Sequence, residues 1–215
     1  MDDLRVVLYL IAAGLFDRPE ANRTDCLDTL IAGVLSTGPK DACWFDLLAL
    51  LRPLLRCDFQ VNAEYTHLFV VGPRRVAAQP FGSYWLEQDR ALMGASALEV
   101  RAMMDYHGLG ENQPSGRMPD HIISELEFMA YLAADHQATR RTQAKLLRGH
   151  LLQWTPKFAR ALRRAMPSER YRLTADFLDQ LLRWDWDYLR GAPNRTKERI
   201  ALPPVLAPGV AQENA

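Results

Sequence analysis

Apolar residues recur at helical spacing along most of the chain, and this pattern predicts a series of amphipathic helices. In residues 2–16, for example, Leu4, Leu8, Ile11 and Leu15 fall on one stripe of a helix. The same spacing returns in residues 24–35, 41–55, 62–71, 95–109, 119–136, 138–154, 155–166 and 168–190. No segment shows the sustained alternation of apolar and polar residues that is typical of a strand. The sequence therefore predicts an all-α fold, a single-domain helical bundle over residues 1–190.

Local signals set the expected ends of several of these helices. Thr24 and Asn62 stand where N-caps are expected, because a short polar side chain accepts a hydrogen bond from the first helical turn. Pro53 is expected near the end of its helix or at a kink, and Gly108 is a candidate C-cap. Residues 191–215 are aperiodic and rich in proline, so they are predicted to form a flexible C-terminal tail.

The clearest break in the helical pattern lies between residues 72 and 85, where glycine and proline are frequent. Loops of about a dozen residues in a compact domain are often functional. This one ends on three aromatic residues, Phe81, Tyr84 and Trp85. Two interpretations stay open: the rings fold back into the core, or they form a rigid rim that binds an apolar peptide segment.

A second candidate site lies at MPDHIISELEFM, residues 118–129, which contains Asp120, His121 and Glu125. On a helix that starts near Pro119, His121 lies one turn before Glu125 and is its expected partner. Asp120 would lie in the first turn, where the helix dipole favours a negative charge. This segment is either a capped helix with one paired carboxylate at the edge of the core or part of a functional site.

The charges balance over the whole chain but not along it. Lysine and arginine number 26, as do aspartate and glutamate, which argues against bulk electrostatic binding to nucleic acid or anionic lipid. Residues 87–135 hold nine acidic residues and three arginines, whereas residues 137–175 hold ten basic residues and one acid. The sequence therefore predicts an acidic and a basic surface, unless both are ordinary solvated helix faces.

Cysteine usage and the N-terminus bear on the compartment. The three cysteines are widely spaced and form no CxxC pair, which favours a reducing compartment over a disulfide framework or a zinc site. The apolar N-terminal stretch follows two aspartates, unlike a signal peptide, and it is too short to span a bilayer. We therefore expect a soluble cytoplasmic protein.

Familiar catalytic patterns do not occur in the sequence. The histidines do not fall at the spacing of a zinc site, and no nucleophile elbow, dinucleotide fingerprint or phosphate loop is present. These absences remove the most recognisable enzyme classes without excluding an enzyme. No metal and no cofactor are expected.

Six short motifs occur in an order that resembles one known family. They are EYTHLF (64–69), PFGSYWLE (80–87), LMG (92–94), EVRAMMDYHGL (99–109), PDHIISELEFMAYL (119–132) and HLLQWTPKF (150–158). Over roughly residues 60–190 the chain resembles the TorD/DmsD/NarJ family of redox-enzyme maturation chaperones. The form of its aromatic motif is closer to the DmsD/TorD branch.

The resemblance implies an all-helical cytoplasmic chaperone without catalytic activity. It implies that the partner is the twin-arginine signal peptide, with the rest of the precursor, of a molybdoenzyme of the dimethyl sulfoxide reductase superfamily. The chaperone would hold the precursor until the molybdenum cofactor is inserted, so the machinery that makes this cofactor is a further expected partner. Neither nucleic acid nor stable insertion into a membrane is expected.

The residues expected at the signal-peptide site divide by chemistry. Carboxylates are expected to face the two arginines of the peptide, and aromatic and apolar side chains its hydrophobic region. His121 is expected to orient Glu125 or the peptide backbone. The complete expected set is Pro80, Phe81, Ser83, Tyr84, Trp85, Leu86, Asp105, Pro119, Asp120, His121 and Glu125.

Two other functions stay open at the level of sequence. The first is a metal-dependent hydrolase built on His121, Glu125 and His150. The second is a helical regulator that binds nucleic acid through the basic residues 160–172, although the balanced net charge disfavours it.

Overall fold

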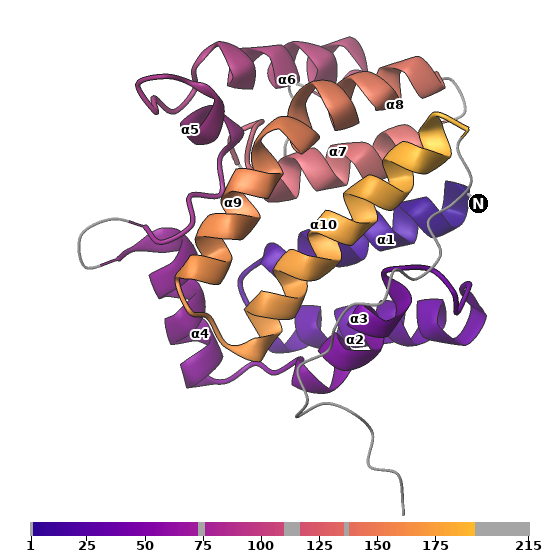
Figure 1. Cartoon of the computed structure of the whole chain (residues 1–215), viewed down its shortest axis with the longest axis vertical. Coiled ribbons are helices and arrows are strands. Elements are labelled where there is room, and N and C mark those ends of the chain that lie inside the picture. The colour runs from indigo at the N-terminus through magenta and orange to yellow at the C-terminus, as the bar shows by residue number, and fades with distance from the viewer. Residues whose placement is uncertain (1, 73–75, 110–116, 136–137, 192–215) are drawn as a thin grey trace, which may run out of the picture.

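The computed structural model describes residues 2–72, 76–109, 117–135 and 138–191, and Figure 1 shows how its helices are arranged. The α-helices are α1 (Asp2–Phe16), α2 (Ala21–Thr37), α3 (Phe45–Leu51), α4 (Phe59–Tyr65), α5 (Gly82–Leu86), α6 (Ala95–Tyr106), α7 (Ile122–Ala134), α8 (Arg140–Leu146), α9 (Leu152–Arg164) and α10 (Glu169–Leu189). A 3₁₀ turn, Arg52–Leu54, follows α3, and π-helical turns follow α4 (Thr66–Val70) and α8 (Leu147–Leu151). These ranges contain no strand, so the predicted all-α fold is confirmed.

The core of the bundle forms around α1. This helix packs against α7, α2 and α10, and α10 in turn packs against α9 and α3. In Figure 1, α10 runs across the front of the molecule with α1 and α7 behind it. The largest buried side chains include Trp44, Trp154 and Trp184, and the rings of Trp44 and Trp184 meet edge to face at 5.8 Å.

A buried ion pair ties the first helix to the last. Arg5 on α1 donates to both carboxylate oxygens of Asp185 on α10, with a distance of 3.1 Å for the Nη2 contact. The hydroxyl of Tyr9 donates to the same carboxylate at 2.6 Å. Arg5 is 1% exposed and Asp185 0% exposed, so neither charge is solvated by bulk water. Each therefore depends on the other, and loss of one would leave a buried, unpaired charge.

Several helix ends differ from the sequence prediction. Thr24 lies inside α2, whose N-cap is Glu20. The N-cap of α4 is Asp58 rather than Asn62, and its carboxylate accepts a hydrogen bond from the backbone N–H of Val61 at 2.9 Å. Both predicted caps were wrong because apolar periodicity places a helix more reliably than it places the first turn.

Two other predictions of helix ends are confirmed. Pro53 lies in the 3₁₀ turn after α3. Gly108 follows α6 with φ +73°, a left-handed conformation that favours glycine. The expected break between Trp154 and Thr155 is wrong, because α9 runs through both residues and the irregular turn precedes it. Apart from Gly191, the predicted tail lies outside the described residues.

Candidate functional site

The two motifs singled out in the sequence lie side by side, joined by a short antiparallel bridge between Phe81 and His121. The backbone N–H of Gly82 donates to the carbonyl of Asp120 at 2.8 Å, and that of Ile122 donates to the carbonyl of Pro80 at 2.8 Å. The rings of Phe81 and His121 meet edge to face at 5.1 Å. The aromatic segment is thus fixed to the start of α7.

Asp120 holds the aromatic segment from inside the protein. It is 0% exposed, and its Oδ2 accepts a hydrogen bond from the backbone N–H of Ser83 at 2.8 Å. It also precedes α7, which begins at Ile122 rather than near Pro119. The expectation that Asp120 lies in the first turn and faces a bound arginine is therefore wrong for this structure, in which the carboxylate positions α5.

Glu125 has a different partner from the one expected. Its Oε2 lies 2.7 Å from Nδ1 of His150, and the indole N–H of Trp154 points to the same oxygen at 3.5 Å. His121 does not reach it, because His121 adopts an extended conformation before the helix and α7 begins one residue later. Glu125 is also 0% exposed, so it does not offer its charge to a ligand at the surface.

The Glu125–His150 pair is buried, and burial and mutual attraction act on its two pKa values in opposite directions. Burial raises the pKa of Glu125 to about 6, although the hydrogen bond and charge of His150 act in the opposite direction. Burial alone would lower the pKa of His150, but the hydrogen bond and negative charge of Glu125 outweigh it and raise this pKa. Between the two pKa values both groups are ionised, and together they link α7 to the turn before α9.

Gly82 allows the aromatic segment to approach this pair. A Cβ atom on Gly82 would lie 2.8 Å from Cε1 of His150 and 3.1 Å from both Oε1 of Glu125 and Nε1 of Trp154. A larger residue would therefore push α5 away from α7 and α9. The glycine of the aromatic motif is needed for close packing, since its backbone requires no left-handed conformation.

His121 caps α7 in its neutral form. Its Nδ1 accepts a hydrogen bond from the backbone N–H of Ile123 at 3.2 Å. Burial and the nearby guanidinium of Arg117 lower the pKa of His121 to about 4, although Asp120 and Asp17 oppose this shift. At neutral pH the ring is uncharged and accepts the capping hydrogen bond.

The expected site residues divide into a supporting set and an accessible set. Pro80, Ser83, Pro119, Asp120 and Glu125 are buried, so they shape the site without facing solvent. The residues with accessible surface are Phe81, Tyr84, Trp85, Leu86, Asp105 and His121. The aromatic rings are half-buried. This degree of burial is intermediate between the two interpretations left open by the sequence, rings folded into the core and rings exposed as a rim.

A groove of about 810 Å³ runs between the aromatic segment and α9. Tyr84 and Trp85 line one side, and α9 forms the other. The indole N–H of Trp85 donates to the carbonyl of Gln79 at 2.8 Å, and Lys157 on α9 donates to the carbonyl of Trp85 at 3.1 Å. These bonds hold the groove open between two fixed walls.

Two carboxylates near Arg117 were missed in the sequence, one of them 20% exposed and the other 50% exposed. Asp17 follows α1 and Glu127 lies on α7, and the guanidinium of Arg117 bridges them at 3.1 Å and 3.4 Å. Their distance in sequence gave no local signal, because the contact depends on the packing of α1 against α7. The surface beside the Phe81–His121 pair thus already accommodates a guanidinium group between two carboxylates.

The two other functions considered from the sequence find little geometric basis. His121 packs on Phe81 while Glu125 faces His150, so the three residues do not converge. No group of three or more metal-binding side chains occurs within the described ranges. Of the basic residues in 160–172, Arg163 and Arg172 are paired with acidic side chains. None of the described helices has the length and hydropathy needed to cross a membrane.

Comparison with known proteins defines the class of protein first. A Tat proofreading chaperone, DmsD of Salmonella typhi, is 27% identical over 164 residues, which cover 73% of this chain and 76% of the relative. A TorD chaperone of Vibrio cholerae is 31% identical over 122 residues, 52% of this chain and 54% of the relative. These relatives are named as chaperones, a non-enzymatic class.

The family follows from a match to most of the helical region. The model of the nitrate reductase delta subunit family matches residues 42–160, and the chain belongs to this family, which contains the NarJ and TorD proteins. A solved structure from Archaeoglobus fulgidus, assigned to redox enzyme maturation, has a TM-score of 0.54 and 22% sequence identity. It covers 83% of this chain and 91% of its own, and it supports the fold. The predicted family is thereby confirmed.

Proposed function

We propose that this protein is a cytoplasmic chaperone that binds the twin-arginine signal peptide of a molybdoenzyme of the dimethyl sulfoxide reductase superfamily. Family membership and the names of its relatives support a chaperone for redox enzymes. The observation that carries the finer proposal is the fixed, half-buried aromatic segment near two carboxylates that hold a guanidinium group between them. A twin-arginine peptide offers the complementary groups, two guanidinium groups followed by an apolar stretch.

The apolar part of the peptide is proposed to cover Phe81, Tyr84, Trp85 and Leu86. The backbone bridge to α7 holds these side chains at the surface before the peptide arrives, so little conformational entropy is lost on binding. Burial of one large aromatic side chain contributes about 1.5–3 kcal/mol. Apolar contact should therefore supply most of the affinity.

The arginines of the peptide are proposed to bind at Asp17 and Glu127 in place of Arg117 and Arg23, which pair with these carboxylates in the structure. Asp105 on α6 is a further exposed carboxylate. Arg117 shows the geometry that a guanidinium adopts there, since it contacts both Asp17 and Glu127. Exposed ion pairs contribute about 0.2–1 kcal/mol each. They should set the preference for arginine and the rate of encounter more than the affinity.

The buried residues of the motifs are proposed to act as positioning residues. Asp120 holds the first turn of α5 through Ser83, and the Glu125–His150 pair packs against Gly82. Substitution of these residues is expected to disturb the aromatic segment and to lower stability together with binding. Substitution of a half-buried residue with accessible surface, such as Phe81, is expected to lower binding more than stability.

The test is calorimetric titration with a synthetic twin-arginine leader. Phe81→Ala should weaken binding about tenfold or more, and Asp17→Asn with Glu127→Gln should weaken it about two- to tenfold. The matched control is Asp25→Asn with Asp41→Asn, which removes two exposed carboxylates from other parts of the surface. Equal affinity for leaders carrying two arginines or two glutamines would contradict the proposal.

The identity of the client needs a separate experiment. The proposed chaperone should copurify with the precursor of a molybdoenzyme from its native host, and this precursor should carry an uncleaved leader. Deletion of the chaperone should lower the molybdenum content of that enzyme while its messenger RNA is unchanged. A normal cofactor content in the deletion strain would argue against a role in cofactor insertion.

A further inference from the structure

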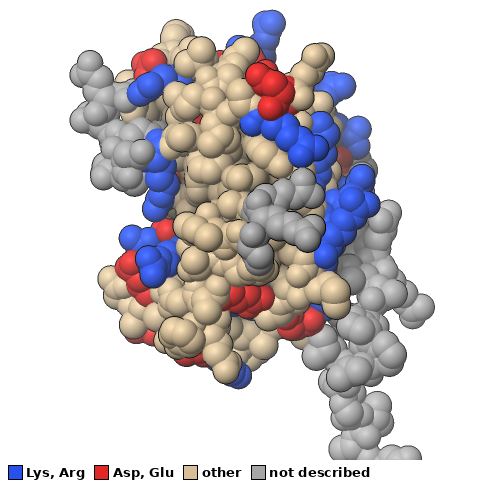
Figure 2. Space-filling model, turned by 90° about the vertical axis from the view of Figure 1, so that its left-hand side faces the viewer, with Lys and Arg blue, Asp and Glu red and all other residues tan. Residues whose placement is uncertain are grey.

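The groove beside the aromatic segment has a basic rim. Arg90 follows α5, and Lys157, Arg160 and Arg164 project from α9 into the lining of the same cavity of about 810 Å³. Figure 2 shows the side of the molecule that is on the left in Figure 1, with lysine and arginine side chains along both edges and acidic side chains near the top and toward the bottom. This charge is opposite to the one that a twin-arginine peptide requires.

The rim cations are not neutralised within the protein. Across the described parts of the chain, no acidic side chain forms an ion pair with Arg90, Lys157, Arg160 or Arg164. The acid in the lining, Glu87, is held instead by the backbone and hydroxyl of Ser96 at 2.9 Å and 2.8 Å. The rim therefore carries an excess of positive charge.

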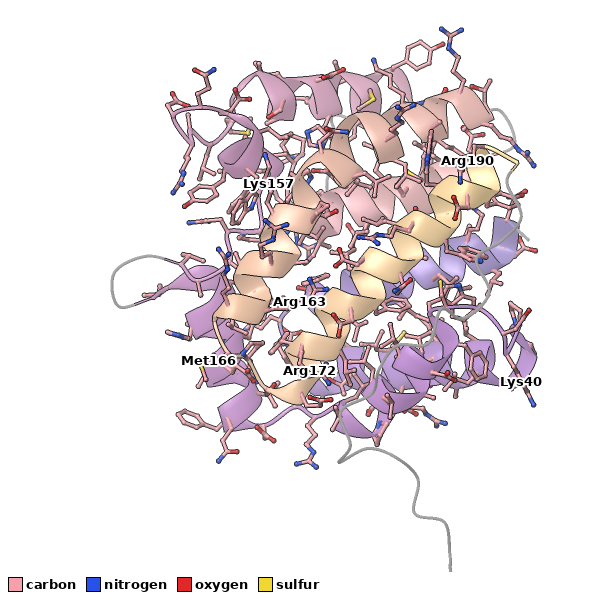
Figure 3. All side chains as sticks on the ribbon, viewed as in Figure 1. Lys40, Lys157, Arg163, Met166, Arg172 and Arg190 are labelled. Atoms are coloured by element: carbon pink, nitrogen blue, oxygen red, sulfur yellow. The ribbon has the colours of Figure 1, made fainter. Side chains whose placement is uncertain are left out.

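On its other face, toward α10, α9 carries an arginine that is paired with acidic side chains. Arg163 contacts Asp176 at 2.8 Å and Asp179 at 2.6 Å, both on α10. Figure 3 shows Arg163 between the two helices, whereas Lys157 lies on the side of α9 toward α5. The fold thus pairs Arg163 with α10, whereas Arg160 and Arg164 have no acidic partner among the described residues.

The cations are arranged as a row. Positions 157, 160 and 164 are separated by about 4.5 Å and 6 Å along the helix axis, because each helical residue rises 1.5 Å. Every second side chain of an extended peptide is separated by about 6.6 Å and points to the same side. The step of about 6 Å between Arg160 and Arg164 is close to the spacing of alternate carboxylates in an extended chain, whereas a compact phosphate group requires cations that converge on one point.

The floor of the groove is apolar. Ala161 and Ala165 lie one turn apart on α9, and Val76 and Ala77 contribute from the opposite wall beside the ring of Trp85. These small side chains leave room for the apolar residues that alternate with carboxylates in such a peptide. The lining therefore combines an apolar floor with a row of unpaired cations.

We propose that this groove binds an extended acidic segment of a partner protein, with its carboxylates on Arg160 and Arg164 and its apolar side chains on Ala161 and Ala165. The cations of this groove are separate from the proposed arginine site at Asp17 and Glu127 and have the opposite charge preference, while Tyr84 and Trp85 belong to both surfaces. The arginine end of a leader is repelled from it. The chaperone would thus hold two segments of opposite charge at once.

The experiment measures binding of a fluorescent ten-residue peptide that alternates glutamate with leucine, at about 0.05 M salt, where exposed charges are weakly screened. Arg160→Gln with Arg164→Gln should weaken binding about three- to tenfold, and Arg160→Glu with Arg164→Glu should weaken it further. The peptide with glutamine in place of glutamate should bind at least tenfold more weakly than the acidic peptide. Raising the salt to about 0.5 M should weaken binding of the acidic peptide.

The matched control is Lys40→Glu with Arg56→Glu, which changes the net charge by the same amount as the glutamate variant. Both residues are exposed, and Figure 3 shows Lys40 at the far end of the molecule from α9. This control should retain wild-type affinity for the acidic peptide. Thermal unfolding establishes whether each variant is folded. If the glutamate variant is unfolded, the binding test uses the glutamine variant.

Three results would overturn the proposal. The first is failure of the wild-type protein to bind the acidic peptide, and the second is equal affinity in the glutamine variant. The third is displacement of the peptide by ATP or by phosphatidylglycerol vesicles at lower concentration than by unlabelled peptide, which would assign the groove to phosphate groups. Titration of the same variants with the twin-arginine leader tests the proposed function separately, because loss of one activity should leave the other.

Discussion

Replacement of Glu125 by glutamine tests whether the buried pair that supports the site is charged. Glutamine has nearly the same shape, and its carbonyl can still accept a hydrogen bond from Nδ1 of His150. The variant removes the negative charge at a position that is 0% exposed. Its diagnostic effect is on the pH dependence of stability, because one of the two coupled titrating groups is removed and the pKa of the other is changed.

The magnitude follows from the raised pKa of Glu125. The native carboxyl titrates at about 6 compared with 4.5 for an ordinary glutamate. This difference corresponds to about 2 kcal/mol at 1.36 kcal/mol for each pKa unit. Because the folded-state pKa is raised, Glu125 contributes stability that is fully present below pH 4.5 and is lost as the pH rises through about 6.

Titration of His150 also makes the wild type less stable, relative to the variant, as the pH rises. In the wild type its pKa is raised by Glu125, so its contribution to stability is lost as the pH rises through that value. In the variant burial is left without the opposing carboxylate, so we expect a lowered pKa and a stability that increases with pH. The unfolding free energy of the variant minus that of the wild type should therefore rise by at least about 2 kcal/mol between pH 4.5 and pH 7.

The assay is urea denaturation at a series of pH values, followed by circular dichroism. Other titrating groups contribute equally to both proteins and cancel in the difference. Glu87→Gln provides a control of opposite sign in a different pH range, because hydrogen bonds from Ser96 lower the pKa of Glu87 and its stabilisation is lost only as the pH falls below about 4.5. A difference between Glu125→Gln and wild type that does not vary with pH would refute the charged pair.

Three further substitutions test the support of the site and the core. Gly82→Ala should lower the unfolding free energy by about 1–3 kcal/mol, since its methyl carbon would lie 2.8 Å from the ring of His150; an unchanged urea midpoint would argue against this close packing. Arg5→Met should cost about 3–5 kcal/mol by leaving Asp185 buried and unpaired, and the second change Asp185→Leu should recover part of this loss. In the wild type, the lowered pKa of His121, about 4, removes about 3 kcal/mol of stability as the pH falls from 6.5 to 4. His121→Asn should abolish this loss in acid denaturation curves while it still caps α7.

The helical architecture could be predicted from the sequence because the apolar residues of each long helix are spaced so that they lie on its buried face. The stripe in residues 2–16 became the buried face of α1, with Leu8, Ile11 and Leu15 all 0% exposed. Helix ends were less predictable, since Thr24 has the chemistry of a cap and yet lies within α2. A capping side chain is one small contribution of about 1 kcal/mol, and tertiary packing readily outweighs it.

The partners within the site could not be read from local spacing. The sequence suggested that Glu125 pairs with His121, which holds only if both residues lie on one helix. His121 instead precedes α7 in an extended conformation, with φ −68° and ψ 139°, and its ring turns toward Phe81. The actual partner, His150, is 25 residues away and is brought back by α8 and the turn that follows it. A contact of this kind depends on how helices pack, which the apolar period of one helix does not specify.

The same packing produces the charge pattern around the aromatic segment, and this pattern limits how the proposed leader can lie. Asp17 and Glu127 both contact Arg117, which lies near His121, whereas Arg160 and Arg164 line the groove beside Trp85. Charges act over roughly 8–10 Å at physiological salt, so each end of the segment experiences mainly its own neighbours. A leader has arginines at one end and apolar residues after them. It is favoured in the orientation that places its arginines near Asp17 and Glu127, and it is disfavoured in the reverse orientation, which places them near Arg160 and Arg164. Selectivity in this site therefore arises from the order of charges along the surface, because carboxylates alone would accept the peptide in either direction.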